Sequence, residues 1–552
     1  MEYEKTIHLE EAGTLAKYIT RSEQNNIFSL KITGFINKKD VDDVLDYMCS
    51  SEGDYDDDGE GDNWIVDEEH FPRLRYLDLS GSTFVGSNKF PDMGLYPLLR
   101  FFAFPQGIEY VCDEDGCCLG GALQIEAVVL PEGVKDAGSY CSENLTEINI
   151  PESVETINDR AFSYCRKLSR IRIPRNVKYI GEGAFAQCGI TTFEIDPENP
   201  YFTTIDGVIF TKNLKTLVAF PPVYRHHYDI PVGTEIIGAG AFEHCNLDTI
   251  HIPDTVTKLE SCAFQCSGLY DIYIPDTVTE IGKICFRGSS NLKKIRLPQN
   301  IHRLVSQAIS GCKNIKEIDI PASVKQIDTT NIVWNESLER ICLHNGHEEI
   351  IGDGPFLCRP GHLKEVYLPK TLRCFPGGMF HYCPDLKSFD LDPENPYYSA
   401  IEDAIYTHDG TKLIAVPDCT RKSFVIPEGV KVIGDFVFMD FKQLEHIQLS
   451  DSLEYIGHRA FNWCCALKEI ILPANLKKID FRTFDDCNLK KIVCLSEQPP
   501  MLIDANPHWK FLHDSKEVII EVPSKSLQLY QKSEGWSQVT LVPIKDKQIQ
   551  WN

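Results

Sequence analysis

Cysteine is the residue type in this sequence that could most readily supply a nucleophile or a metal ligand. The 552-residue chain contains 21 cysteines, and eight of them follow an Ala-Phe-x-x segment or its variants. A residue that recurs at one position of a repeat is expected to be a small buried packing group with its S–H facing the backbone. We therefore predict free structural thiols, since disulfides between flanking cysteines would need an oxidising compartment. The eight are Cys165, Cys188, Cys245, Cys266, Cys312, Cys383, Cys464 and Cys487.

Other groups that could carry catalysis are scattered along the chain. His226-His227 is a pair in a predicted loop, with no acidic or cysteine partner at ligand spacing. A Ser or Cys nucleophile needs a histidine that is itself held in place. The sequence has no Gly-x-Ser-x-Gly elbow, no HExxH motif and no phosphate-binding loop. We predict that the protein is not an enzyme and uses no cofactor.

Two segments have a partial likeness to metal sites. Asp54–Asp62 begins like a calcium loop, with Asp at positions one, three and five and Gly at six. The pattern then fails, because Gly61 replaces an apolar residue and Ile65 stands where the bidentate Glu belongs. A solvated acidic loop is favoured, and a weak cation site stays open as the alternative. Cys112–Cys118 has no CxxC pair or nearby histidine at zinc spacing, so no metal is predicted there.

The remaining candidate site is a set of side chains that alternate with core residues along the predicted strands. Such side chains point outward, and successive strands align them in columns. Tyr and Arg are over-represented in binding hot spots, while mixed charges on an exposed sheet are also typical of a soluble surface. Both interpretations stay open. The predicted binding residues are Arg170, Arg172, His251, Tyr273, Lys294, Arg296 and Tyr367.

A repeat of 22 or 23 residues must position these side chains. In Leu145–Pro174, two isoleucines alternate with a polar residue, which indicates a strand with one buried face. A proline ends that strand because it has no N–H to donate. A Val-x-x-Ile segment then turns inward, and an Ala-Phe pair fills the layer between repeats. No repeat can bury its apolar side alone, so stacked repeats are predicted to share one continuous core.

The predicted fold is an α/β repeat solenoid dominated by β-structure. We expect a curved leucine-rich repeat horseshoe of about eighteen rungs, with a parallel β-sheet on one face. Residues 1–70 are predicted to form an N-terminal cap, with short helices at Glu11–Tyr18 and Lys39–Met48. Residues 71–495 form the solenoid. Residues 496–552 form a C-terminal cap with a final strand and a short amphipathic helix.

Two near copies interrupt the repeats at residues 193–222 and 389–418. They are displaced by 196 residues, from Phe193 to Phe389, and alternating apolar positions flank a turn in each. Both are predicted to be β-hairpins that stand off the edge of the solenoid.

Charge and hydropathy limit the function classes. The formal net charge of −26 argues against binding to nucleic acid or to an anionic membrane. No apolar run approaches the roughly 18 residues of a membrane helix. The first residues lack the basic and apolar regions of a signal peptide. A cytosolic protein and a mature chain with an added start Met both stay open, and a monomer is expected.

The repeat resembles the BspA-like leucine-rich repeat family. The pattern L-x-x-I-x-I-P-x-x-V-x-x-I-G-x-x-A-F-x-x-C is plain in residues 247–298, and the likeness covers roughly residues 70–495. AGTL…SLKITGFINKKDV and VPSKSLQLYQKSEGW are similar to the flanks of Bacteroidetes surface proteins. The resemblance implies a secreted or cell-surface adhesin or recognition protein that binds a protein or glycoprotein. The alternative is an intracellular scaffold for protein assembly.

Overall fold

The computed structural model describes residues 3–24, 26–45, 74–91, 98–111, 124–224, 226–352, 362–380, 383–504, 511–512 and 518–545. Two compact units are present. The first is Met1–Leu269 with Glu280–Ser289, and the second is Tyr270–Thr279 with Ser290–Asn552. The prediction of a parallel-strand solenoid is confirmed, with about 20 turns and little helix.

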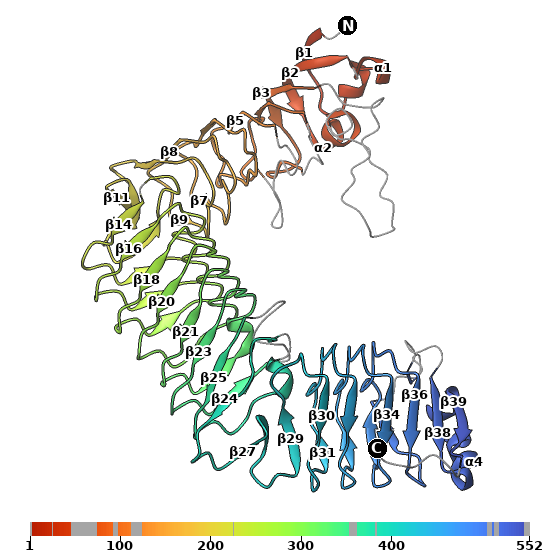
Figure 1. The fold of residues 1–552 in the computed structure, drawn as a ribbon. Coiled ribbons are helices and arrows are strands. Elements are labelled where there is room, and N and C mark those ends of the chain that lie inside the picture. Colours follow the sequence, from red (N-terminus) through yellow and green to blue (C-terminus); the bar gives the residue numbers. More distant parts are fainter. Residues whose placement is uncertain are drawn as a thin grey trace. The chain divides into compact units, whose positions relative to one another are not determined.

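In each unit, one row of parallel strands carries the outward-pointing residues that are predicted to bind a partner. In the first unit, a six-stranded sheet begins at the N-terminal end, where β1, β2 and β3 lie side by side (Figure 1). Its strands are β1 (Tyr3–Leu9), β2 (Ile27–Ile36), β3 (Tyr76–Phe84), β4 (Phe101–Ala103), β5 (Ala127–Val129) and β6 (Glu147–Asn149). The pairs β8 (Arg170–Ile173) with β10 (Thr192–Ile195), and β14 (His227–Asp229) with β16 (Thr249–His251), continue the row.

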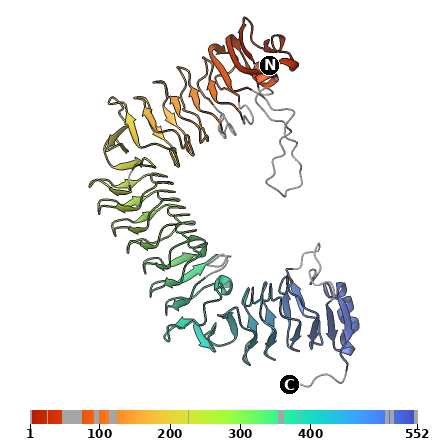
Figure 2. The same ribbon diagram turned by 45° about the horizontal axis from the view of Figure 1, so that its top comes forward.

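The second unit repeats this arrangement. Figure 2 shows its strands following one another as separate rungs, and all pairs in the row are parallel. The strands are β18 (Asp271–Tyr273), β20 (Lys294–Arg296), β21 (Glu317–Asp319), β23 (Arg340–Cys342), β25 (Glu365–Leu368), β26 (Asp390–Leu391), β30 (Ser423–Val425), β32 (His446–Gln448), β34 (Glu469–Leu472), β36 (Lys491–Cys494), β38 (Ile519–Val522) and β39 (Thr540–Pro543).

The Val-x-x-Ile segments form a second row of shorter parallel strands. In the first unit these are β7 (Thr156–Ile157), β9 (Tyr179–Ile180), β13 (Thr216–Ala219), β15 (Ile236–Ile237), β17 (Lys258–Leu259) and β19 (Glu280–Ile281). In the second unit they are β22 (Gln326–Asp328), β24 (Glu349–Ile351), β29 (Lys412–Ala415), β31 (Val432–Ile433), β33 (Tyr455–Ile456), β35 (Lys478–Asp480) and β37 (Met501–Ile503).

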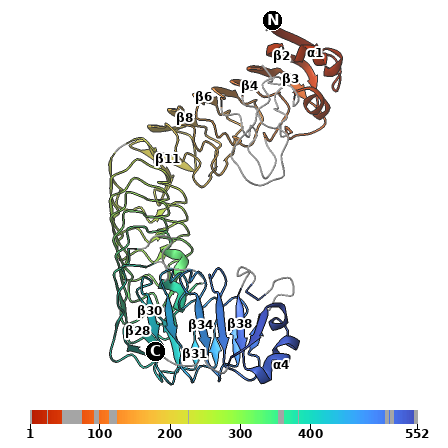
Figure 3. The same ribbon diagram turned by 45° about the vertical axis from the view of Figure 1, so that its right-hand side comes forward.

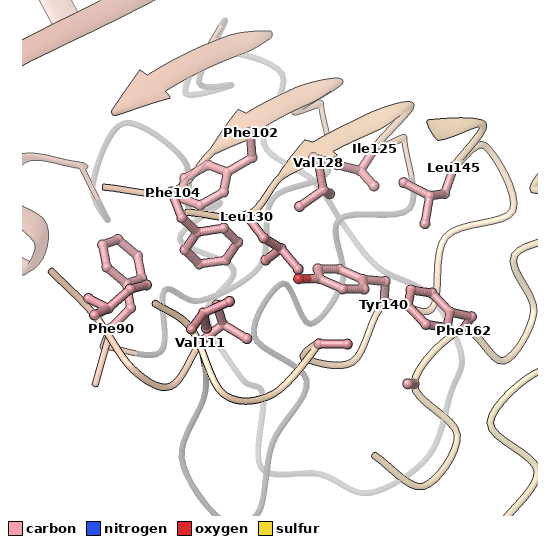
Figure 4. Packing of buried hydrophobic residues seen from close by; sticks show 14 of the residues in the cluster. Phe90, Phe102, Phe104, Val111, Ile125, Val128, Leu130, Tyr140, Leu145 and Phe162 are labelled. Atoms are coloured by element: carbon pink, nitrogen blue, oxygen red, sulfur yellow. The ribbon is translucent and has the colours of Figure 1, made fainter. Parts of the chain in front are cut away.

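Each rung turns at its proline and fills its interior with phenylalanine. Val154 N donates to Pro151 O at 3.1 Å, so the proline that ends one strand also begins the turn to the next. The phenylalanines stack between rungs, as predicted. Phe242 and Phe264 have ring centroids 5.0 Å apart and lie nearly parallel, at 5°. Figure 4 shows how such buried side chains make a continuous core from Phe102 to Phe162 in the first unit.

Both insertions contain antiparallel hairpins, but they do not stand off the solenoid. In the first, β11 (Phe202–Ile205) pairs with β12 (Val208–Thr211), which pairs with β13. β13 then pairs in parallel with β15, so the last strand of the insertion is itself a rung. The second insertion does the same through β27 (Tyr398–Ile401), β28 (Ala404–Thr407), β29 and β31. The expected edge projection is therefore wrong, because the hairpin is aligned with the second row of strands.

A buried asparagine fixes the start of the first insertion. Asn199 is 1% exposed. Its Nδ2 donates to Pro174 O at 2.9 Å and Val177 O at 3.0 Å, and its Oδ1 accepts from the N–H groups of Tyr201 and Phe202, both at 2.8 Å. The side chain thus joins the insertion to the preceding rung with all of its amide hydrogen bonds made.

Helix is confined to short segments. The expected helix at Glu11–Tyr18 is reduced to one 3₁₀ turn, Leu15–Lys17, while Lys38–Leu45 is helical and leaves Asp42 and Asp43 exposed. Figure 3 shows α4 at the C-terminal end of the second unit. β39 follows α4 and pairs with β38, so the expected final strand is not the last one. The other helical segments are α1 (Arg21–Gln24), α2 (Lys38–Asp40), η2 (Val41–Leu45), η3 (Thr329–Asn331), η4 (Gly377–Phe380), η5 (Ser524–Ser526), α4 (Leu527–Lys532) and η6 (Trp536–Gln538).

Candidate binding face

The predicted columns exist within each sheet. Arg170 and Arg172 lie on β8, opposite Thr192 and Glu194 of β10, and all four point away from the core. The positive charge of Arg172 is already matched by acidic neighbours. Its Nη1 lies 2.8 Å from Glu152, and its Nη2 lies 2.5 Å from Asp196. This part of the face therefore carries both positive and negative charges, and it is less positive than Arg170 and Arg172 alone would make it.

His251 lies beside a strand that sequence reasoning missed. β14 pairs with β16 and places Asp229 opposite His251. Asp229 Oδ1 lies 3.3 Å from His227 Nε2 and 3.9 Å from His251 Nδ1. His226 is 3.0 Å from Asp248. The prediction that His226-His227 is a loop pair without an acidic partner is therefore wrong.

The missed strand carried a signal in the sequence. Tyr228-Asp-Ile230-Pro231 has the aromatic-x-Ile-Pro form of a rung end. Pro231 keeps the repeat spacing to Pro253, but the predicted columns omit the outward residues of this rung, which comes directly after the insertion. His227 and Asp229 therefore belong to the outward columns together with His251.

The second unit brings Tyr273 and Arg296 into direct contact. Tyr273 is 58% exposed, and the Arg296 guanidinium lies over its ring, 4.7 Å from the centroid. Arg296 Nη1 donates to Ile274 O at 2.9 Å, and the guanidinium forms an ion pair with Asp276 at 2.6 Å. Hydrogen bonding from Arg296 lowers the pKa of Asp276. These contacts hold the Arg296 guanidinium group in place, and the guanidinium in turn fixes the exposed ring of Tyr273.

Lys294 and Tyr367 occupy outward positions on other strands of the second unit. Lys294 is exposed on β20, opposite Asp271 of β18. The Tyr367 hydroxyl donates to Asp392 at 2.8 Å. Burial, with this hydrogen bond, raises the pKa of Tyr367 to about 12. Tyr367 is therefore a neutral hydrogen-bonding residue at physiological pH.

The recurring cysteines are packing groups. Cys165, Cys188, Cys245 and Cys464 are buried free thiols. Cys165 Sγ donates to Tyr140 O at 2.9 Å, and Cys487 Sγ donates to Phe461 O at 2.8 Å, each reaching the preceding rung. Burial raises the pKa of Cys165 and of Cys188 to about 12. Thiols with such a pKa stay protonated and are poor nucleophiles.

Possible metal ligands were sought among the described residues and in the two segments with a partial likeness to metal sites. Within the described residues, no three His, Cys, Asp or Glu side chains are grouped so that they could hold an ion. Asp54–Asp62 and the residues from Cys112 to Cys118 lie outside the described residues. In the same described part of the chain, no helix is long and apolar enough to cross a membrane.

The repeat matches a known family. The BspA type Leucine rich repeat region is matched in six copies, over residues 135–226, 219–339, 329–398 and 415–499. The chain belongs to the BspA-type leucine-rich repeat family. This membership points to a protein-interaction or surface role. The family and its solenoid fold are typically non-enzymatic.

Solved structures of other bacterial leucine-rich repeat proteins are similar to the chain. One from Bacteroides ovatus is 21% identical and covers 71% of this chain and 88% of its own, with a TM-score of 0.40. A leucine rich cell surface protein from Faecalibacterium prausnitzii is 19% identical, covering 66% and 80%, with a TM-score of 0.34. Pneumococcal vaccine antigen PcpA is 17% identical, covering 63% and 88%, with a TM-score of 0.29. No curated protein matches the chain.

Proposed function

We propose that this is a non-enzymatic macromolecule-binding protein that uses the outward face of its first row of strands. The observation that carries the proposal is the Tyr273–Arg296 pair. A tyrosine that is 58% exposed has its ring under a guanidinium that Asp276 and Ile274 O hold in place. Such a pair presents a large contact area and loses little side-chain freedom on binding.

The partner that suits this face is a protein or glycoprotein at a cell surface. The face combines aromatic, cationic, anionic and histidine side chains, which favours polar recognition over burial of a lipid or nucleic acid. The net charge of −26 opposes approach to nucleic acid. The resemblance to surface-attached repeat proteins supports an adhesin or recognition protein.

Binding of the full chain to immobilised extracellular-matrix glycoproteins tests this function. We expect measurable binding to at least one glycoprotein and a loss of about tenfold in affinity for Y273A, which is the scale of a hot-spot residue. Y179A is the matched control, because Tyr179 is 51% exposed but lies on β9, in the second row of strands. Equal loss in both variants, or no binding by the wild type, contradicts the proposal.

An intracellular scaffold is the second candidate, and the cysteines favour it. Buried free thiols such as Cys165, Cys188, Cys245 and Cys464 suit a reducing compartment. Mass spectrometry of the N-terminus from fractionated cells separates the two functions. A processed N-terminus in the envelope fraction supports the adhesin. An unprocessed Met1 in the soluble cytosol supports the scaffold and contradicts the surface location.

A further inference from the structure

One position of the repeat holds glycine in two rungs of the first unit that meet directly. In several rungs the residue before the apolar-Phe pair adopts a positive φ, and some of these rungs place a side chain there, as in Cys262 (φ 56°) and Ile284 (φ 59°). Gly183 (φ 57°) and Gly240 (φ 63°) occupy the same position. A Cβ on Gly240 would lie 2.3 Å from Gly183 N. Glycine is therefore needed here for space, because the backbone conformation alone is tolerated by other residues.

A buried carboxylate lies against these two glycines. The Glu243 side chain is 1% exposed, and its Oε1 is 3.3 Å from Arg160 Nη2. Its Oε2 has no hydrogen-bond partner in the structure. A Cβ built on Gly183 would meet that oxygen at 2.2 Å, so Oε2 points at the glycine contact. A buried carboxyl oxygen without a hydrogen-bond partner is costly, and such a group calls for a ligand.

A small cavity opens beside the carboxylate. It measures about 10 Å³, which is close to the space that one water molecule or one ion needs. Most of its lining residues are small or apolar, and Glu243 supplies the ionisable side chain among them. The lining includes Gly183, Phe185, Val218, Phe220, Gly240 and Glu243. The size excludes organic cations with several heavy atoms.

The second insertion shows that the fold does not require this arrangement. In the rung that follows the second insertion, Phe436 stands where the rung after the first insertion has Gly240, and Met439 replaces Glu243. Gly378 is retained at the position of Gly183, and a Cβ there would meet Phe436 Cβ at 2.4 Å. Met439 is 7% exposed. The same place in the second unit is thus filled by an aromatic ring and a thioether, while the first keeps a cavity and an acid.

Arg160 is the positively charged neighbour of Glu243, and the Glu182 carboxylate adds a negative charge nearby. Burial is the largest influence on Glu243 and raises its pKa, while Arg160 opposes the rise. Divalent ions such as Ca²⁺ need six to eight oxygen ligands, several of them charged. One carboxylate in a cavity of this size fits a monovalent ion better.

We propose that the cavity beneath Glu243 binds one monovalent metal cation, Na⁺ or K⁺, with Glu243 Oε2 as its charged ligand. The ion would pair with the oxygen that Arg160 leaves without a partner and would tie together the two rungs that meet at Gly183 and Gly240. The two rungs that flank the first insertion are therefore joined through a cation, and those that flank the second are joined through apolar groups.

Thermal unfolding of the full chain in NaCl, KCl and choline chloride at equal ionic strength tests the proposal. Choline is too large for the cavity. We expect the Tm to be about 2 °C or more higher in NaCl or KCl than in choline chloride, because an ion that binds the folded state stabilises it. E243Q keeps the shape and loses the charge, so this difference should vanish. E194Q, which changes an exposed carboxylate of the same unit, should keep it.

A second pair of measurements covers the case in which E243Q does not fold. ²³Na NMR of the wild type should show line broadening from bound sodium, which added K⁺ should compete away. G240F, which copies the residue in the rung after the second insertion, should fill the cavity and abolish the broadening. The same Tm in all three chlorides, with no sodium broadening, overturns the proposal and leaves a cavity that holds water only.

Discussion

At the scale of single residues, burial and neighbouring groups decide which side chains are able to react with or bind another molecule. Burial raises the pKa of the Cys165 and Cys188 thiols. The S–H groups of Cys165 and Cys487 donate to backbone carbonyls. Tyr273 has the reverse situation, since it is exposed and its neighbour Arg296 is fixed by Asp276. The proposed binding residues Tyr273 and Arg296 therefore combine a fixed side-chain arrangement with exposure to solvent.

Thiol alkylation tests the structural role of the cysteines. In native protein at neutral pH, iodoacetamide should label the exposed Cys141, Cys374 and Cys465 first. Cys165 and Cys188 should react about 10³-fold more slowly, because a thiol with a pKa near 12 has almost no thiolate. Mass spectrometry of peptides after timed quenching gives the rates. Rapid labelling of Cys165 in folded protein would contradict the packing role.

Asp136 gives a prediction for pH dependence. It is 7% exposed, its Oδ1 accepts from Gly138 N at 2.9 Å, and burial raises its pKa from 3.8 to about 6. Between these values the folded state keeps a proton that the unfolded state loses, so this group's contribution to stability falls as pH rises from about 4 to about 6. Compared with D136N, the wild type should lose about 1–3 kcal/mol over that range.

Denaturant midpoints of the wild type and D136N, measured in parallel across this range, check the Asp136 prediction. Asparagine keeps an oxygen for Gly138 N but cannot titrate, so the comparison isolates the ionisation. A difference between the two proteins that stays constant with pH would show that the Asp136 pKa is not raised.

At the scale of elements, much of the fold could be predicted because each rung is specified locally. Ile-x-Ile-Pro predicts a strand and its end, and Ala-Phe predicts the stacked layer seen between Phe242 and Phe264. The failures occur where contacts are non-local. β14 comes directly after an insertion. β13, the last strand of that insertion, pairs in parallel with β15, and this pairing cannot be predicted from the repeat pattern. Glu243 could not be recognised either, because its neighbour Arg160 is 83 residues away.

The asparagine that begins each insertion provides a test at this scale. Asn395 repeats the contacts of Asn199, donating to Pro369 O at 2.9 Å and accepting from Tyr397 N at 2.8 Å. N199A would leave buried N–H and C=O groups without partners, at an expected cost of about 2–4 kcal/mol.

The control for N199A is Asn213→Ala in the exposed turn of the same insertion. Asn213 accepts from Lys215 N at 3.0 Å, and because solvent can replace that bond, the loss should stay below about 1 kcal/mol. Urea unfolding followed by circular dichroism measures both variants. Equal costs for N199A and N213A would mean that the buried asparagine does not fix the insertion.

At the scale of the whole molecule, neighbouring rungs match one another in charge as well as in packing. Glu155 lies between Lys135 and Lys178, and Glu339 lies between Lys316 and Lys364. Each exposed pair adds little stability, but each one joins two adjacent rungs, and a solenoid is stabilised by contacts between adjacent repeats. Arg172 is paired in the same way, with Glu152 and Asp196. The outward columns could be read from the sequence, whereas the carboxylates that fix their arginines come from turns and could not.

The central claim is that partners bind the outward face of the first row of strands, and site-specific photo-crosslinking tests it most directly. A photoreactive phenylalanine derivative at position 273 of the full chain should crosslink to the immobilised glycoprotein that the wild type binds. The same derivative at position 179, which is similarly exposed on the second row of strands, should not. Crosslinking from position 179 but not from position 273 would contradict the account and assign binding to the other row.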